Sequence, residues 1–133
     1  MIEVCCAIIF RGSKILAVQR GPLSPHPWKW EFPGGKTDLH ETAEQCIIRE
    51  IEEELSIKVE VITQLASIEY DYGNNPIILV PFVCKIIGGK ILLTEHVALC
   101  WLAPEELETL DWSAADEALI LKNIEQLKLF AGY

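Results

Sequence analysis

The spacing of apolar residues predicts several short β-strands interrupted by one strong helix. Apolar runs rich in β-branched residues cover Val4 to Phe10 and Ile15 to Gln19, and the Arg-Gly-Ser-Lys segment between them suits a hairpin turn. The pattern predicts further strands at residues 30–32, 57–72, 77–87 and 97–102. It predicts turns where glycine, proline and asparagine gather, at residues 33–35, 73–76 and 88–89.

Helical periodicity is strongest from Thr42 to Leu55, where Ile47 and Ile51 fall on one apolar face. A short helix from Pro104 to Leu110 and a closing helix from Ser113 to Leu129 are also predicted. The order of elements contains no repeated βαβ unit. We therefore expect an α+β fold, an α/β/α sandwich in which helices cover both faces of a central mixed β-sheet.

Length and composition indicate a globular protein. The 133 residues, half of them hydrophobic, suit one domain spanning residues 1–133. The net charge of −9 argues against binding to a nucleic acid polymer, because the surface repels phosphate on average. The five scattered cysteines are expected to be buried and free, and no apolar run reaches the roughly 20 residues of a membrane span. We expect a cytoplasmic protein.

Glutamates at positions 50, 52, 53 and 54 crowd the predicted long helix. Like charges three and four residues apart weaken a helix by a few tenths of a kcal/mol per pair unless a cation compensates. A bound divalent metal would supply that compensation, but a solvated acidic face is the commoner explanation for such a helix. The spacing alone leaves both interpretations open.

The sequence around these glutamates resembles the Nudix box of the Nudix hydrolase superfamily. Gly35 is followed after five residues by Glu41 and after seven more by Arg-Glu-Ile-Glu-Glu-Glu-Leu-Ser-Ile from Arg49 to Ile57. Eight of nine specified positions match, and the exception is Ser56, where the family has glycine. The segments WEFPGGK and EHVALCWLAPEEL extend the resemblance to MutT-like members over nearly the whole chain. The resemblance implies a Nudix-like fold.

The resemblance also implies a metal site. In the family, the residues that correspond to Glu50, Glu53 and Glu54 bind metal. The backbone carbonyl at the position of Gly34 commonly completes the site. Mg²⁺ is the expected ion, with Mn²⁺ as an alternative, since both prefer oxygen ligands. One of the glutamates, with Glu53 and Glu50 as candidates, is expected to orient or deprotonate the attacking water.

Three further charged residues are assigned by their place in or near the box. Arg49 is expected to hold the carboxylates in position, paired with Glu41, because its forked guanidinium binds two oxygens at once. Glu95 lies where MutT-like enzymes place another acidic group and could serve as general base. Its alternative is an exposed loop glutamate beside His96.

Substrate contacts are expected outside the box. Lys36 and Arg20 border segments that converge on the Pro-Gly-Gly turn and are candidate phosphate ligands. Asp116 resembles the polar residue that MutT-like enzymes present to the base, and the alternative role is an N-terminal helix cap. Phe32 could offer a stacking face to the base. No chemistry is assigned to His26.

The implied reaction is Mg²⁺-dependent hydrolysis of a nucleoside or deoxynucleoside triphosphate to the monophosphate and pyrophosphate. A carboxylate at position 116 can accept from an exocyclic amino group, which favours cytosine nucleotides, whereas a protonated one could bind oxidised guanine. The alternatives are a Nudix hydrolase of another diphosphate-linked nucleoside and a non-catalytic nucleotide-sensing module. The partner is in each case a small nucleotide, with the protein as a monomer or homodimer.

Overall fold

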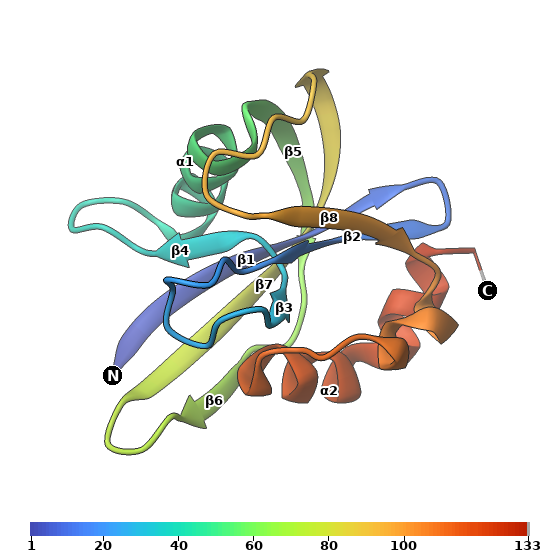
Figure 1. Ribbon diagram of the computed structural model, residues 1–133. Coiled ribbons are helices and arrows are strands. Elements are labelled where there is room, and N and C mark those ends of the chain that lie inside the picture. The colour runs from blue at the N-terminus through green and yellow to red at the C-terminus, as the bar shows by residue number, and fades with distance from the viewer. Residues whose placement is uncertain (133) are drawn as a thin grey trace.

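A mixed eight-stranded β-sheet lies at the centre of the protein, which a computed structural model describes over residues 1–132 (Figure 1). The elements in chain order are β1 (Ile2–Arg11), β2 (Lys14–Gln19), β3 (Trp30–Glu31), β4 (Gly34–Lys36), α1 (Ala43–Leu55), β5 (Ile57–Gln64), β6 (Ile68–Asp71), β7 (Pro76–Gly89), β8 (Ala98–Leu102), the 3₁₀ helix η1 (Pro104–Thr109) and α2 (Ala114–Phe130).

The sheet is built around the parallel pair β1 and β7. Their register runs from Ile2 opposite Ile77 to Phe10 opposite Lys85. The strand order is β3-β2-β1-β7-β5, with β4 beside β1, β6 beside β7 and β8 beside β2, and these other pairs are antiparallel. The hairpin turns predicted at residues 11–14 and 73–76 are present, and the second begins two residues earlier, because Asp71 pairs with Pro76.

The two α-helices cover opposite faces of this sheet (Figure 1). Alternate residues of a strand point to opposite faces, and β1 shows the consequence. Cys5 and Ala7 pack with α1 in one buried cluster, whereas Cys6 and Ile8 pack with α2 in the other. This arrangement confirms the expected α/β/α sandwich.

Some boundaries differ from the prediction. The expected strand at residues 57–72 is two strands, because the backbone of Ala66 leaves the sheet to bond Asn123 of α2 at 3.3 and 2.9 Å. Gly88 and Gly89 are the end of β7 and pair with β5, so the predicted turn there is wrong. The segment after Pro104 is a 3₁₀ helix. Within residues 1–132, neither α-helix is long and apolar enough to cross a membrane.

Four of the five cysteines are buried and all five are free thiols, as expected, while Cys100 is only half-buried. Burial raises the pKa of the Cys84 thiol to about 12. It also raises the pKa of Cys5 and Cys46. A thiol with a raised pKa carries little thiolate and is a poor nucleophile, so these residues act as small apolar side chains.

Helix α1 begins and ends with specific local contacts. The Thr42 hydroxyl accepts the Gln45 N–H at 3.1 Å, and the Gln45 side chain accepts the Thr42 N–H at 2.9 Å. This capping box fixes the start of the helix. At the other end Ser56 adopts the left-handed conformation, with φ 58° and ψ 30°, and its N–H donates to the Glu52 carbonyl at 3.0 Å.

The left-handed geometry of Ser56 predicts that Ser56→Gly stabilises the protein. A side chain costs energy in this region, so glycine should raise the free energy of unfolding by about 0.5–1 kcal/mol. The thermal midpoint should rise by about 2–5 °C. Thermal unfolding in EDTA measures the effect. An unchanged midpoint would show that the position carries no strain.

Candidate functional site

The site is built where β4 lies between β1 and helix α1. Gly34 and Gly35 pair with Cys6 and Cys5 of β1. A Cβ added at Gly34 would overlap the Cys5 carbonyl, and one at Gly35 would overlap the Glu50 carboxyl group. Both glycines lie in strand β4 and neither has a positive φ, so the turn predicted at residues 33–35 is wrong for this pair. Both are needed because the space leaves no room for a side chain.

Two of the predicted metal-binding glutamates point into this narrow space. The Glu50 carboxyl group lies against Gly35. Glu54 is only 5% exposed, and its Oε2 accepts the Gly34 N–H at 3.2 Å. Helix positions 50 and 54 face the same side of α1, so both carboxylates reach the backbone of β4.

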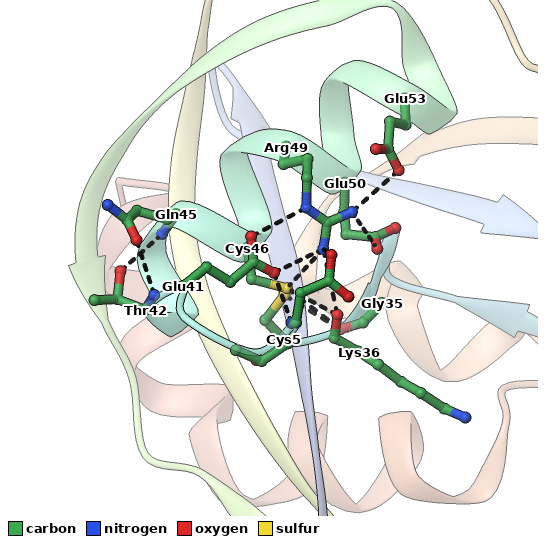
Figure 2. A network of polar contacts seen from close by, with 12 residues as sticks. Cys5, Gly35, Lys36, Glu41, Thr42, Gln45, Cys46, Arg49, Glu50 and Glu53 are labelled. Atoms are coloured by element: carbon green, nitrogen blue, oxygen red, sulfur yellow. Dashed lines mark hydrogen bonds and ion pairs between the residues drawn. The ribbon is translucent and has the colours of Figure 1, made fainter.

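Arg49 forms the centre of the charged network beside these residues (Figure 2). Its Nε and NH2 groups donate to both oxygens of Glu41 at 3.1 and 2.7 Å, and NH1 donates to Glu50 at 3.0 Å and Glu53 at 3.2 Å. This contact holds the pKa of Glu41 down at about 2. The predicted pairing of Arg49 with Glu41 is confirmed. The guanidinium contacts four carboxylates, because it also lies 3.3 Å from Asp38.

Glu53 is placed differently from its two neighbours. Its side chain is 58% exposed, bends to Arg49, and does not line the cleft that contains Glu50 and Glu54. In the described part of the chain no three His, Cys, Asp or Glu side chains form a ready metal cluster. The ligand set of Glu50, Glu53 and Glu54 thus stays a prediction that requires a change in the Glu53 side chain.

The loop before β8 carries Glu95 to the same place. Thr94 fastens this loop to the end of α1, because its hydroxyl donates to the carbonyls of Glu53 and Glu54 at 3.0 and 3.1 Å. The Thr94 N–H also donates to the Glu54 carbonyl, at 3.2 Å. Glu95 is exposed and lines the cleft.

Acidic side chains outnumber Lys and Arg among the residues that line the cleft. Burial, followed by the charges of Glu95, Glu31 and Glu50, raises the pKa of Glu54 to about 9. Burial and the charges of Glu53 and Glu95 also raise the pKa of Glu50, although Arg49 opposes them. Oxygen atoms that repel one another around a narrow space suit a hard divalent cation. The donor set therefore fits Mg²⁺ or Mn²⁺.

The cleft has a volume of about 450 Å³ and continues from these glutamates to the start of α2. Glu31 lies in it and bridges two side chains: Oε1 accepts from Arg20 and Oε2 contacts Nε2 of His96, each at 2.8 Å. Glu31 perturbs the pKa of both Glu54 and Asp116, so it lies between the two ends of the cleft.

The two predicted phosphate ligands differ in whether the cationic group already has an ion-pair partner. Arg20 lines the cleft, but its guanidinium is engaged by Glu31. Lys36 also lines the cleft, and its exposed ammonium group has no ion-pair partner among residues 1–132. Its side chain extends away from the Arg49 network (Figure 2). Lys36 is the cation better placed for an anionic ligand.

Asp116 lies at the far end of the cleft in the first turn of α2. Its Oδ1 accepts the Phe32 N–H at 3.0 Å, and burial followed by the charge of Glu31 raises its pKa to about 8. The capping position is Ser113, so the alternative of Asp116 as the N-terminal cap is wrong. The Phe32 ring packs on Trp112 with a centroid distance of 4.9 Å and is 3% exposed. Its stacking on a base remains a prediction.

Sequence reasoning missed several residues of the cleft. Glu31 stands in the WEFPGGK segment, but its two partners are distant in sequence. His26 also lines the cleft, stacked on Tyr72 at a centroid distance of 4.8 Å. A lone histidine in a proline-rich loop gives no signal of such a contact. Position alone identified neither His26 nor His96.

The fold and the site define a Nudix pyrophosphohydrolase, a hydrolase of phosphorus-containing anhydrides. The chain belongs to the NUDIX domain family, whose profile matches residues 1–123. Nudix hydrolases act on small nucleotide substrates and generally use a divalent metal ion.

Individual relatives are similar over most of the chain. The CTP pyrophosphohydrolase of Escherichia coli K12 is 38% identical over 90% of this chain and 89% of its own. The 8-oxo-dGTP diphosphatase of the same strain is 31% identical over 91% and 95%. The crystal structure of a MutT NUDIX hydrolase from Burkholderia pseudomallei superposes with a TM-score of 0.80 at 30% identity, covering 94% of this chain and 96% of that one.

The buried carboxyl group of Asp116 predicts a pH-dependent stability. Its pKa is about 8 in the folded state against an ordinary value of 3.8, so the folded chain keeps a proton that the unfolded chain releases. The stabilisation of the folded state by this proton is complete below pH ~3.8 and is lost as the pH rises toward 8. We expect the thermal midpoint in EDTA to fall between pH 5 and 8, and to fall less in Asp116→Asn.

Asparagine keeps the oxygen that accepts the Phe32 N–H, so only the titration is removed. For each rise of one pH unit, the free energy of unfolding of Asp116→Asn should fall by up to about 1.4 kcal/mol less than that of the parent. Glu117→Gln, at an exposed position of the same helical turn, is the matched control and should keep the parent's slope. Parallel curves for Asp116→Asn and the parent would contradict a protonated Asp116.

Proposed function

We propose that the protein hydrolyses a nucleoside or deoxynucleoside triphosphate to the monophosphate and pyrophosphate, with Mg²⁺ as cofactor and cytosine or oxidised guanine as the base. The observation that carries this proposal is the placement of carboxylates and Asp116 in one cleft. Glu50, Glu54 and Glu95 occupy one end of it and Asp116 the other. A cytoplasmic location stays a prediction of the sequence.

In this proposal Glu50, Glu54 and the carbonyl of Gly34 hold the metal, with Glu53 joining when its side chain leaves Arg49. The ion, when bound, supplies positive charge that offsets the phosphates and lowers the pKa of a water molecule. Arg49 keeps the glutamates in register by binding Glu50 and Glu53 from the side away from the cleft.

The residues of the chain then share the remaining steps. A water oxygen bonds to one of the two phosphorus atoms of the anhydride link between the α- and β-phosphates. The P–O bond from that phosphorus to the bridging oxygen breaks, which gives the monophosphate and pyrophosphate. Glu95 or Glu53 takes the proton of the water. Lys36 binds the phosphates as a free cation, and Arg20 assists when the substrate competes with Glu31. Asp116 hydrogen-bonds the base, and protonation lets it donate as well as accept.

Metal binding should be visible as a gain in stability. Saturating Mg²⁺ at 100 times its Kd raises the free energy of unfolding by about 2.7 kcal/mol if it binds only the folded state. We expect a higher thermal midpoint for the parent in Mg²⁺ than in EDTA. Glu54→Gln should lose most of this gain, and in EDTA it should be at least as stable as the parent because it removes a buried, repelled carboxyl group.

Glu52→Gln is the matched control for this experiment. Glu52 is on the same helix but exposed, and it lies outside the cleft. It should keep the full Mg²⁺ effect. Equal stabilisation of Glu54→Gln and the parent would exclude Glu54 as a metal ligand.

The reaction is tested with a panel of nucleotides. Purified protein in Mg²⁺ is incubated with CTP, dCTP, 8-oxo-dGTP, dGTP and a nucleoside diphosphate sugar, and the products are separated. We expect monophosphate plus pyrophosphate from a triphosphate, and a loss of at least about 100-fold in kcat for Glu53→Gln if Glu53 takes part in the proton transfer. Turnover of the diphosphate sugar alone, or of no compound, would overturn the proposed substrate class.

A further inference from the structure

Ser113 stands at the N-terminal cap of α2 without acting as a cap. Serine at this position ordinarily accepts the N–H of the second or third helical residue. The hydroxyl of Ser113 makes no such bond. Its oxygen is buried with no partner among the described residues, and the residue is 4% exposed. A buried hydroxyl without a partner is costly and calls for an explanation.

Tyr72 explains why the hydroxyl is free. The N–H of Ala115, the second residue of α2, donates to the Tyr72 hydroxyl at 2.9 Å. Tyr72 therefore satisfies from the β6–β7 turn an amide that the cap would otherwise serve. Ser113 itself is held firmly, because its N–H donates to the Trp30 carbonyl at 2.8 Å. The backbone that carries the hydroxyl is thus fixed, and no described residue uses the hydroxyl itself.

Ser113 lines the same cleft as Asp116 and Tyr72. We propose that the Ser113 hydroxyl is a specificity-determining contact that hydrogen-bonds the nucleobase beside Asp116. The inference rests on the proposed function, which places a nucleotide in this cleft.

The ligand group at this end is a base and not a phosphate. Asp116 lies in the first turn of α2, and Glu31, which also lines the cleft, is the largest charge acting on it. A phosphate would meet these carboxyl groups, whereas a neutral base with polar edges would not be repelled. The ring of Tyr72, stacked on His26, supplies an aromatic wall beside the two polar groups.

A hydroxyl next to a carboxyl group suits a base edge with two adjacent polar atoms. Serine donates one hydrogen bond and accepts others, so it can meet an amino or a keto group. The second oxygen of Asp116 is not engaged by Phe32, which bonds Oδ1. Cytosine offers an amino group beside a ring nitrogen, and oxidised guanine offers a keto oxygen beside a ring N–H. The pair therefore reads the base, while the sugar and phosphates lie toward the glutamates.

The test compares Ser113→Ala with the parent on CTP, 8-oxo-dGTP and ribose 5-triphosphate, which has no base. We expect kcat/KM for the better nucleotide to fall about 5- to 10-fold, as for one lost neutral hydrogen bond, and that for ribose 5-triphosphate to stay the same. Ser113→Thr, which keeps the hydroxyl, should restore most of the rate. Ser13→Ala, in the exposed β1–β2 turn, should match the parent.

Two measurements that need no turnover distinguish a base contact of Ser113 from a structural role. Calorimetric binding of the matching monophosphate in EDTA should weaken by a similar factor in Ser113→Ala. The thermal midpoint should not fall, because no cap bond is lost. A midpoint lowered by several degrees, or an equal loss on ribose 5-triphosphate, would overturn the base contact in favour of a structural role.

The remaining outcomes are also decisive. A parent that hydrolyses nucleoside triphosphates while Ser113→Ala matches it on every substrate would overturn the Ser113 contact alone. A parent that hydrolyses no nucleoside triphosphate would overturn the proposed function, and the Ser113 contact with it.

Discussion

The close approach of β4 to both β1 and helix α1 is the constraint on which the whole site depends. Two glycines without Cβ atoms let the backbone lie against the Cys5 carbonyl on one side and the Glu50 carboxyl group on the other. The Gly34 N–H then reaches Glu54. A carboxylate that would otherwise project from a helix into water is thereby buried beside a backbone strand, which gives an acidic helix a defined, concave environment.

The acidic residues on and just before α1 differ in whether a cation compensates them. Arg49 neutralises Glu41 and holds Glu53, and the lowered pKa of Glu41 shows how strongly that pair is favoured. Glu54 has no ion-pair partner among residues 1–132, and burial with nearby carboxylates raises its pKa to about 9. The salt-bridge network and the cleft proposed to bind the metal ion therefore meet on one helix, where Glu50 contacts Arg49 and also lines the cleft.

Residues close in sequence were predicted well, and residues joined by folding were not. The capped helix and the Arg49–Glu41 pair follow from spacing and from the Nudix box. The contacts of Glu31 with Arg20 and His96 join β3 to two loops, so no local pattern announces them. The glycines show a subtler limit, since their importance was predictable but its cause was not. A pair of glycines is found both where a turn needs unusual dihedrals and where a side chain has no room, so the sequence does not distinguish the two causes.

In the proposed function, the reaction and the choice of substrate depend on different parts of the chain. The relatives at 38% and 31% identity carry the names of a CTP and an 8-oxo-dGTP hydrolase, so overall similarity does not rank the bases. The box lies on β4 and α1, whereas Asp116, Ser113 and Tyr72 come from α2 and the β6–β7 turn. These segments meet only through tertiary packing. Under the proposed function, a change there is expected to alter the preferred base without disturbing the carboxylates, because Glu31 with its two partners lies between them.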